Sequence, residues 1–491
     1  MKTIPLHFFL ARIAIFCLFS AGVPGIPKAQ AGVTLSVSPS GTPYSTIQGA
    51  IDAARDGDTI QVYPGTYYET IVFSGKAITL ESTKGADITV IDGGKNGPVV
   101  TFQDNETRDS VIQGFTITNG RGYWGAFGGG IFCAGTASPR ILDNILSKNT
   151  ALHYGGGICC YEYASPEISG NVITHNTADE HGGGIFSFFK AAPVIAHNTI
   201  QDNTCDDYGG GICCFLYVDA QIIDNLISGN HAGRWGGGIF GYNASPDIRR
   251  NKIFGNSAGQ NGGGIALDRT ESLIVNCMIA GNAAVRGGGV WIGYDATPFL
   301  LHNTLTDNLA EEGHELWSGF RSLIRITNSI VWNLAGNMIY NDADSATEVS
   351  HSTVFGHFPG PGNIGDAPLF ANPDQMDFHL TPNSPGIDKA LHASEVQIDF
   401  ECDSRPLKAG YDMGADEFRP APCMGNADND TDVDISDFAI FAADFGRTDC
   451  ERDTACNSDF DGDGDVDVSD FAIFAANFGR TDCLHDDGSG F

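Results

Sequence analysis

Residues 155–181 read GGGICCYEYASPEISGNVITHNTADEH, and residues 182–208 repeat the pattern as GGGIFSFFKAAPVIAHNTIQDNTCDDY. The block Gly-Gly-Gly-Ile begins at Gly128, Gly155, Gly182, Gly209, Gly236 and Gly262, and a Val version begins at Gly287. Successive blocks are 27, 27, 27, 27, 26 and 25 residues apart. A near-constant period of this length is typical of solenoid proteins, in which each repeat forms one structural unit.

Two columns of asparagines follow the same period. The first column consists of Asn144, Asn171, Asn198, Asn225, Asn251, Asn276, Asn303 and Asn328. The second consists of Asn149, Asn176, Asn203, Asn230, Asn256, Asn282, Asn308 and Asn333. The apolar residues between the columns are Leu146, Ile173, Ile200, Ile227, Ile253, Ile279, Leu305 and Ile330. Every repeat is therefore predicted to follow the same path through space.

The composition of the repeats excludes stacked helices. Glycine triplets and frequent prolines disfavour helices. Alternating runs such as Pro166-Glu-Ile-Ser-Gly-Asn-Val-Ile173 favour strands of three to five residues. Coils of such strands stack at about 4.8 Å and pair their backbones. We expect the asparagines to form amide ladders at the bends, and the glycines to permit turns where a Cβ atom would clash.

These repeats resemble the right-handed parallel β-helix superfamily, which includes pectate lyases, polygalacturonases and many other secreted proteins. They are also similar to the repeats of bacterial polymorphic outer-membrane proteins. The resemblance spans roughly residues 35–419 and implies an all-β solenoid. It further implies a short helix near residues 45–55 over the open N-terminal end, and closing segments at residues 378–388 and 411–418. These motifs specify a fold but not an activity.

The N-terminus has the pattern of an export signal. Lys2 and Arg12 precede an apolar run from Ile13 to Val23, and Ala29-Gln30-Ala31 offers a cleavage site. We expect residues 1–31 to be removed, which leaves a secreted or cell-surface protein without a membrane span. The net charge of −33 argues against nucleic acid and anionic lipid as partners.

Three segments follow the predicted signal. Residues 32–110 are assigned to an N-terminal cap with the first coils, and residues 111–419 to the repeats with the closing segments. Residues 420–491 form a separate tail, in which residues 423–491 hold 18 acidic and 3 basic residues, a net charge of −15. Such a tail attracts cations, above all calcium.

The tail is an internal duplication with an offset of 33 residues. The first copy offers Asn426, Asp428, Asp430, Asp432, Asp434 and Asp437, and the second offers Asp459, Asp461, Asp463, Asp465, Asp467 and Asp470. Both copies place oxygen ligands at loop positions 1, 3, 5, 9 and 12, with position 7 free to give its carbonyl. A calcium loop requires this spacing, so we expect two Ca²⁺ sites in a small, EF-hand-like helical domain.

The duplicated loops resemble dockerin domains, which use two loop–helix units with Asp at position 12. Dockerins attach secreted carbohydrate-active enzymes to cohesin-bearing scaffolds, so the resemblance implies a cohesin-like partner. Position 6 is Thr431 in the first loop, where Gly is usual, and we expect that site to bind calcium more weakly.

The cysteines fall into two groups. Cys423 and Cys456 precede the two loops, and Cys450 and Cys483 follow the helices, which predicts two disulfides. Three connectivities are possible, and we favour Cys423–Cys450 with Cys456–Cys483 because each would close one unit. In the body, the cysteines of the repeats are interpreted as stacked core thiols, although a bridge between neighbouring coils is sterically conceivable. They are Cys133, Cys160 and Cys214 in one column, and Cys159 and Cys213 in the next.

Polar residues interrupt the repeats just before the glycine triplets. One column consists of His153, Glu180, Asp207 and Arg234, and its neighbour consists of Tyr154, His181, Tyr208 and Trp235. At about 4.8 Å per coil, Glu180 and Asp207 are predicted to lie side by side. Adjacent carboxylates suit a retaining glycosidase pair or a calcium site, and their repulsion should raise one pKa. A solvated turn with stacked opposite charges is the alternative.

Aromatic residues near this step offer surfaces for sugars. Tyr208 and Trp235 are expected to stack on sugar rings through their apolar faces. A second outward column, formed by Tyr161, Phe188, Phe215 and Tyr242, follows the glycine triplets. It predicts either a glycan platform or a ladder covered by a loop.

Two functions stay open on these patterns. The first is a secreted protein that acts on or binds polysaccharide, as a lyase, a glycosidase or a binding derivative, and is tethered by its tail. The second is a non-catalytic surface or adhesion protein with a β-helix spacer. The regular repeats favour the second function, and the charged step at residues 179–208 favours the first. In that step, Glu180, Asp207, Arg234, His181 and His153 are the candidate catalytic residues.

Overall fold

The computed structural model describes residues 32–41, 43–122, 127–407, 409–420, 423–428, 430, 432–448, 450 and 456–480. The chain divides into two compact units between Glu417 and Phe418. The predicted signal segment 1–31 and Cys483 lie outside the described residues. Among the helices of the described residues, none has the length and apolar character needed to cross a membrane.

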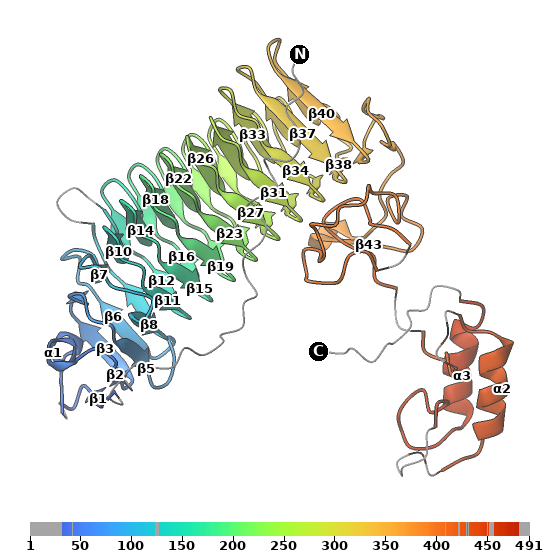
Figure 1. The fold of residues 1–491 in the computed structure, drawn as a ribbon, viewed down its shortest axis with the longest axis horizontal. Coiled ribbons are helices and arrows are strands. Elements are labelled where there is room, and N and C mark those ends of the chain that lie inside the picture. Colours follow the sequence, from blue (N-terminus) through green and yellow to red (C-terminus); the bar gives the residue numbers. More distant parts are fainter. Residues whose placement is uncertain are drawn as a thin grey trace, which may run out of the picture. The chain divides into compact units, whose positions relative to one another are not determined.

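The first unit is a parallel β-helix whose coils contribute strands to three long sheets, A, B and C, and to a short sheet D (Figure 1). Sheet A consists of β1 (Thr34–Val37), β2 (Thr59–Val62), β5 (Thr79–Ser82), β8 (Val111–Gln113), β11 (Arg140–Leu142), β15 (Glu167–Ser169), β19 (Val194–Ala196), β23 (Gln221–Ile223), β27 (Asp247–Arg249), β31 (Leu273–Val275), β34 (Phe299–Leu301), β37 (Leu323–Thr327) and β40 (Ala346–Ser350). Sheet B consists of β3 (Gly65–Tyr68), β6 (Thr89–Asp92), β9 (Thr116–Thr118), β12 (Ile145–Ser147), β16 (Val172–Thr174), β20 (Thr199–Gln201), β24 (Leu226–Ser228), β28 (Lys252–Phe254), β32 (Met278–Ala280), β35 (Thr304–Thr306), β38 (Ile330–Trp332) and β41 (Thr353–Val354). Sheet C consists of β4 (Ile71–Val72), β7 (Val100–Phe102), β10 (Ile131–Ala134), β14 (Ile158–Tyr161), β18 (Ile185–Phe188), β22 (Ile212–Phe215), β26 (Ile239–Tyr242), β30 (Ile265–Asp268), β33 (Val290–Gly293), β36 (Leu316–Ser318) and β39 (Ile339–Asn341). Sheet D consists of β13 (Thr150–Ala151), β17 (Thr177–Ala178), β21 (Thr204–Cys205), β25 (His231–Ala232) and β29 (Ser257–Ala258).

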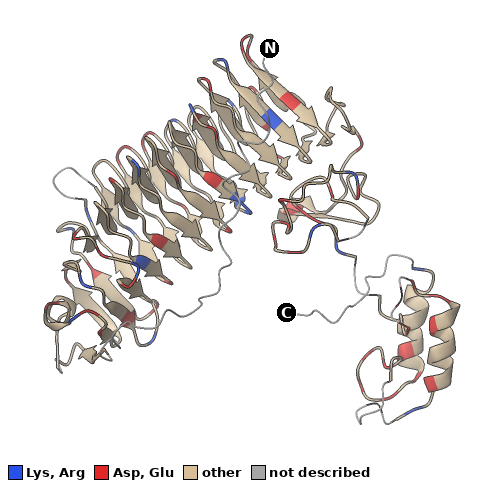
Figure 2. Cartoon of the chain, viewed as in Figure 1, with Lys and Arg blue, Asp and Glu red and all other residues tan. Residues whose placement is uncertain are grey.

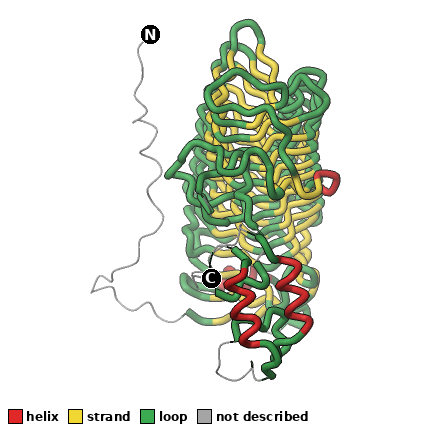
Figure 3. Tube along the Cα trace, turned by 90° about the vertical axis from the view of Figure 1, so that its right-hand side faces the viewer, coloured by secondary structure: helices red, strands yellow, loops and turns green. Residues whose placement is uncertain are grey.

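Successive coils lie in parallel register, so equivalent residues stack along the solenoid (Figure 3). In β22, Ile212 and Cys214 are buried in the central core, whereas Cys213 belongs to an apolar cluster on the opposite face of the strand. The predicted cysteine columns are confirmed, because Cys133 pairs with Cys160 and Cys213 follows Phe186 in register. These thiols are buried and free, so the bridge between coils does not form.

The second asparagine ladder is confirmed from Asn149 to Asn308, but Asn333 does not continue it, because the Glu315 carboxylate accepts from Asn308 instead. Nδ2 of Asn203 donates to the carbonyl of Ile173 at 2.8 Å and to Oδ1 of Asn230 at 3.0 Å. Its Oδ1 accepts from the backbone nitrogen of Asn176 at 3.0 Å. Each buried amide therefore satisfies backbone groups that the bend leaves unpaired.

The first ladder is confirmed as far as Asn251, but the assignment of Asn276 and Asn328 to it is wrong. Cys277 stands 26 residues after Asn251, and its backbone nitrogen donates to Oδ1 of Asn303 at 2.9 Å. Ser329 takes the next place, where its Oγ accepts from the backbone nitrogen of Asn303 at 3.1 Å. Asn276 and Asn328 precede these positions by one residue and bond to residues outside the ladder.

The glycine triplets pass where neighbouring coils approach closely. Gly182 has a φ of +69°, a backbone conformation that side chains rarely adopt. A Cβ atom on Gly183 would lie 2.5 Å from the carbonyl oxygen of Thr204, which is backbone and cannot move aside. The glycine triplets therefore allow the backbones of neighbouring coils to approach closely just before each strand of sheet C.

The predicted helix at the N-terminal end is α1 (Ile47–Ala53), shorter than the expected range. The Thr46 side chain caps it by accepting from the backbone nitrogen of Gly49. Ile47, Ala50 and Ile51 are fully buried in the central core. This packing closes the apolar interior at the first coils.

Residues 366–417, here called the strap, contain β42 (Phe370–Asn372), a 3₁₀ turn (Pro373–Gln375) and β43 (Asp377–Leu380). The two predicted closing segments lie in the strap, but the structure places it along the side of several coils. Glu401 bonds Lys252 at 2.9 Å, and the carbonyl of Leu391 accepts from Nδ2 of Asn328 at 2.7 Å. At the last coil, Phe355 and Phe358 pack against the central core.

The second unit contains α2 (Ile435–Asp444) and α3 (Val468–Asn477). Each helix begins with the same capping box, made by Asp434 with Asp437 and by Asp467 with Asp470. Phe441 and Phe474 stack between the helices, with ring centroids 6.1 Å apart. The predicted duplication therefore folds as two similar loop–helix halves.

The favoured disulfide pairing in this unit is wrong. Cys450 is bonded to Cys456, six residues further along the chain. Cys423 is also disulfide-bonded. The bridge Cys450–Cys456 therefore links the two halves of the unit at their connection, instead of closing each half separately.

Candidate functional site

Aromatic side chains cover the outer surface of sheet C, here called the aromatic face. Its members stand in three rows that follow the coils. One row consists of Phe127, Tyr154, His181, Tyr208 and Trp235. The middle row contains Phe132, Phe186, Phe240, Trp291, Trp317 and Tyr340. The third row consists of Tyr161, Phe188, Phe215 and Tyr242. The two predicted aromatic columns are thus brought together with a middle row that was not predicted.

The rings of the aromatic face stack on one another. Tyr208 lies between His181 and Phe240, at centroid distances of 4.7 and 4.9 Å and interplanar angles of 26° and 27°. Phe215 lies 4.7 Å from Tyr242 in a similar arrangement. Stacking occupies the ring faces and turns ring edges outward. A ligand on these rows would meet edges and hydroxyl groups rather than open faces.

A hollow of about 160 Å³ opens between the rows. It is lined by Phe127, Tyr154, Tyr161, His181, Phe186, Phe188 and Phe215. Burial lowers the pKa of His181, so its ring is neutral at pH 7, and its Nδ1 is buried without a hydrogen-bond partner. Burial and the hydrogen bond to Glu180 raise the pKa of Tyr154 to about 12. The hollow therefore combines apolar walls with uncharged hydrogen-bonding groups.

The charged step beside the hollow has the predicted register, but the pKa of Glu180 differs from the prediction. Glu180 and Asp207 are on adjacent coils, and the backbone nitrogen of Asp207 donates to the Glu180 carbonyl at 2.9 Å. The Glu180 carboxylate bonds Nδ1 of His153 at 2.6 Å, and Asp207 pairs with Arg234 at 3.7 Å. Burial tends to raise the pKa of Glu180, but hydrogen bonds from Tyr154 and His153 lower it below its usual value.

The expected general acid is therefore absent at Glu180. The predicted rise in one pKa of the pair does not occur at Glu180, whose carboxylate is paired with His153, and Asp207 is paired with Arg234. Arg234 also lies over the rings of Tyr208 and Trp235, 5.4 and 5.9 Å from their centroids. The charged step is thus a row of paired charges, and its arginine makes cation–π contacts with two rings of the aromatic face.

One carboxylate of this surface was not predicted. Asp268 follows Tyr242 in register, is 2% exposed, and bonds Arg269 at 2.8 Å. Burial raises its pKa to about 6, against the opposing effect of Arg269. Continuing the column Tyr161, Phe188, Phe215 and Tyr242 by one 26-residue step would have found it in the sequence.

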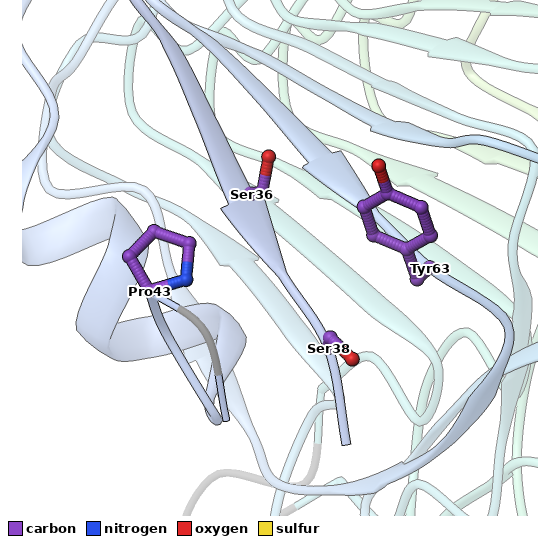
Figure 4. Close-up of a pocket in the computed structure, with 4 residues that line it drawn as sticks. All are labelled: Ser36, Ser38, Pro43 and Tyr63. Atoms are coloured by element: carbon purple, nitrogen blue, oxygen red, sulfur yellow. The ribbon is translucent and has the colours of Figure 1, made fainter. Parts of the chain in front are cut away.

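A second hollow, of about 600 Å³, lies at the N-terminal end (Figure 4). Ser36, Ser38, Pro43 and Tyr63 line it, and Ser36 belongs to the terminal strand β1. The phenol of Tyr63 is the only ionisable side chain among these four lining residues. This hollow therefore lacks the paired charges and stacked rings of the aromatic face.

The acidic loops of the second unit bring carboxylates together in groups that fit a calcium ion. Carboxylate oxygens of Asp459, Asp461 and Asp463 lie within 4.8 Å of one another, as do those of Asp465, Asp467 and Asp470. In the first loop, Asp432, Asp434 and Asp437 form the same kind of group, and acidic residues gather on this unit in Figure 2.

Asp432 and Asp465, at equivalent positions of the two loops, also fit a bound cation. Oδ1 of Asp432 and Oδ1 of Asp465, at equivalent positions, are buried without hydrogen-bond partners. Burial and then neighbouring carboxylates raise the pKa of Asp432 and Asp465. An oxygen-only set with unmet acceptors and mutual repulsion fits a hard cation. Thr431, which replaces the usual Gly, lies outside the described residues.

The right handed beta helix region family matches residues 78–267 and 220–368, which together span more than half of the chain. The protein belongs to this family of right-handed parallel β-helices. No curated protein matches it in sequence.

Solved structures share the fold at low sequence identity. XylC, in its complex with xylose, is 10% identical with a TM-score of 0.51, and the match covers 78% of this chain and 98% of XylC. The pectate lyase Pel9A is 12% identical with a TM-score of 0.39, over 80% and 98% of the two chains. The PL6 family alginate lyase AlyGC, solved as a point mutant, is 14% identical with a TM-score of 0.43, over 77% and 60%.

Proposed function

We propose that this is a secreted polysaccharide-binding protein whose second unit binds two calcium ions and attaches it to a cohesin-like scaffold. The observation that carries the proposal is the aromatic face, which continues along sheet C from Phe132 to Tyr340. The middle row is buried, with Phe186, Phe240, Trp291 and Trp317 at most 4% exposed, and the half-buried rings of the outer rows border the hollow of about 160 Å³. A hollow with apolar walls and a few polar groups is the usual form of a binding site. Ring edges combined with hydroxyl, imidazole and carboxylate groups suit sugars, because the edges offer apolar contact and the polar groups bind sugar hydroxyls.

Binding, rather than cleavage, is the function that the charged step favours. Cleavage by a carboxyl pair needs one group that holds a proton near neutral pH. The pKa of Glu180 is lowered instead, and Asp207 is paired with Arg234. Both carboxylates therefore act in this proposal as acceptors for sugar hydroxyls and as anchors for His153 and Arg234.

The binding proposal is tested by affinity electrophoresis in gels that contain xylan, β-glucan, mannan, pectate or alginate. Xylan is included because XylC holds a xylose. We expect at least one polysaccharide to retard the protein, and the double variant Phe188→Ala, Phe215→Ala to abolish the retardation. Tyr68→Ala is the matched control, because Tyr68 is 79% exposed and lies on sheet B. Retardation by none of the gels would overturn the proposal.

Cleavage at Asp268 is a second candidate, favoured by the pKa of about 6 that burial gives this carboxyl. A carboxyl with that pKa is half protonated near pH 6 and suits a general acid. The test is release of reducing or unsaturated ends from the bound polysaccharide. The cleavage hypothesis predicts that Asp268→Asn abolishes product release while Glu180→Gln retains it. Product release by Asp268→Asn at the wild-type rate would reject it.

The calcium and attachment part of the proposal rests on the second unit. In the first loop, Asn426, Asp428, Asp430, Asp434 and Asp437 would hold the ion, with the carbonyl of residue 432; the equivalent residues of the second loop would hold the other. Bound Ca²⁺ would offset the carboxylate repulsion and order the loops. Exposed apolar residues at matching positions of the two helices offer a contact surface, namely Ile435, Phe438, Val468 and Phe471.

A binding assay against a panel of cohesin modules tests the attachment. We expect binding in calcium and its loss in excess EGTA. Equal binding in both conditions would reject the calcium requirement, and no binding to any module would reject the cohesin-like partner.

A further inference from the structure

Three consecutive turns that follow sheet C carry bulky side chains at positions where small residues are usual. After β14 come Glu162 and Tyr163, after β18 come Phe189 and Lys190, and after β22 come Leu216 and Tyr217. All six have positive φ values, between 42° and 64°. Two adjacent left-handed residues normally require Asn, Asp or Gly, and bulky residues there are strained. Strained positions of this kind are often retained at functional sites.

The turns are held in register by the same pairing as the strands. The backbone nitrogen of Tyr163 donates to the carbonyl of Phe189 at 3.2 Å, and that of Lys190 donates to Leu216 at 3.2 Å. Tyr217 donates likewise to Asn243 at 2.6 Å. The side chains on these turns therefore form a fixed row parallel to the solenoid axis. We call Tyr163, Phe189, Lys190 and Tyr217 the turn edge.

The rings of the turn edge are arranged unlike those of the aromatic face. Tyr163 is 48% exposed and Tyr217 is 58% exposed. Phe189 meets both at steep interplanar angles, 81° to Tyr163 and 73° to Tyr217, so neither tyrosine is stacked face to face with it. Two coils separate the tyrosines, which places them about 10 Å apart along the axis. In an extended β-linked polysaccharide, alternate sugars present the same face.

The arginines of this surface are already paired with carboxylates. Arg269 pairs with Asp268 at 2.8 Å, Arg234 with Asp207 at 3.7 Å, and Arg321 with Asp295 at 2.6 Å. On the turn edge, Lys190 lies over the rings of Tyr163 and Phe189, 5.5 and 5.4 Å from their centroids, and Glu162 stands on the neighbouring turn. The whole chain has a net charge of −33. A polyanion would meet no cluster of unpaired cations among these residues and would be repelled by the protein as a whole.

We propose that the turn edge binds an extended, uncharged polysaccharide along the solenoid axis, with alternate sugars stacked on Tyr163 and Tyr217. The proposal rests on the proposed polysaccharide-binding function and narrows it to a ligand class and to named residues. Phe189 lies between the two tyrosines and contacts both at steep angles, and Lys190 covers one face of the Tyr163 ring, so that sugars stack on the other face. Glycans rich in uronic acids are disfavoured as ligands, because the arginines are paired with carboxylates and the chain has a net charge of −33.

The test is calorimetric titration with xylan, β-glucan and mannan hexasaccharides, and with oligogalacturonate and oligoalginate of the same length. EGTA is present, so that calcium does not bridge uronates to the tail. We expect a neutral hexasaccharide to bind at least about tenfold more tightly than either uronate. The variant Tyr163→Ala, Tyr217→Ala should lose about tenfold in affinity through the lost stacking, whereas Tyr68→Ala should bind as the wild type does.

The outcomes separate this proposal from the function on which it rests. Tighter binding of a uronate overturns the ligand class. Unchanged affinity of the tyrosine double variant, with loss of binding in Phe188→Ala, Phe215→Ala, overturns the turn edge and leaves the polysaccharide-binding function standing. Absence of binding to every glycan overturns both. Circular dichroism of each variant confirms that the solenoid is intact.

Discussion

Glu315 ends the asparagine ladder at Asn308. The Glu315 carboxylate accepts hydrogen bonds from the backbone nitrogen of Asn308, at 3.1 Å, and from its side-chain amide. Nδ2 of Asn333 donates to the same carboxylate at 2.8 Å. In the coil that contains Gly313, Glu315 stands where earlier coils have the third glycine of the triplet. A buried acid thus replaces the next amide oxygen as the terminal acceptor.

This burial makes the stability of the solenoid depend on pH. Burial raises the pKa of Glu315 from 4.5 to about 8, against the effect of the three donors. The folded state therefore binds a proton that the unfolded state has released, so the contribution to stability is present below about pH 4.5 and declines until about pH 8. We expect the unfolding free energy of the wild type to fall relative to Glu315→Gln across this range. Chemical denaturation at several pH values measures it, and parallel pH profiles would refute the assignment.

Removing one ladder amide should be costly. Asn203→Ala leaves the carbonyl of Ile173 and the backbone nitrogen of Asn176 buried without partners. At about 1–3 kcal/mol for each unsatisfied group, we expect a loss of roughly 2–6 kcal/mol in unfolding free energy. Gln201→Ala, on the same coil but facing outward, is the control and should change stability by less than about 0.5 kcal/mol. Equal losses in the two variants would mean that the ladder is not a source of stability.

Calcium should bind the two loops of the second unit unequally. Gly464 occupies position 6 of the second loop with a φ of +96°, which Thr431 at the equivalent position of the first loop would adopt only with strain. We expect two binding events by calorimetry, the tighter removed by Asp463→Ala and the weaker by Asp430→Ala. Ser469→Ala, at an exposed non-ligand position, should leave both events unchanged. A protein that binds no calcium would contradict the proposal.

Proton competition gives the calcium sites a second signature. Burial and neighbouring carboxylates raise the pKa of Asp428 and Asp461, so protons compete with the ion more strongly than at an ordinary aspartate. We expect calcium affinity to weaken as the pH falls from about 7 towards 4. Affinity that stays constant over this range would exclude these carboxylates as ligands.

The disulfide Cys450–Cys456 makes a direct chemical prediction. Proteolysis of the unreduced protein should release one peptide cross-linked between these two cysteines, identified by mass spectrometry. Reduction should lower the stability of the second unit, because its small core needs such links, and should leave the solenoid unaffected. A cross-linked peptide that joins Cys423 to Cys450 would restore the pairing favoured by the sequence.

The sequence predicts the solenoid well because its register is nearly constant. A 27-residue period puts Tyr161, Phe188 and Phe215 in one row without any knowledge of distances. The same reasoning fails at Asn276, which stands 25 residues after Asn251, because the ladder continues 26 residues after Asn251, at Cys277. A single-residue slip moves a side chain from the inside to the outside.

The chemistry of the candidate site was less predictable. Whether Glu180 repels Asp207 or binds His153 depends on the directions of side chains in neighbouring coils. The aligned repeats give the register of the coils but not these directions. The turn edge was missed for a similar reason, since positive φ values at Tyr163 and Tyr217 leave no signature when the residues are not Gly or Asn. The disulfide pairing depends on how the two loop–helix halves pack.

A crystal structure of the mature protein soaked with a neutral hexasaccharide tests the central claim most directly. The account predicts sugar rings in contact with sheet C, on the hollow at Tyr154 and Phe188 or along the turn edge at Tyr163 and Tyr217. Sugar bound only to sheet A, to sheet B or to the second unit would contradict it.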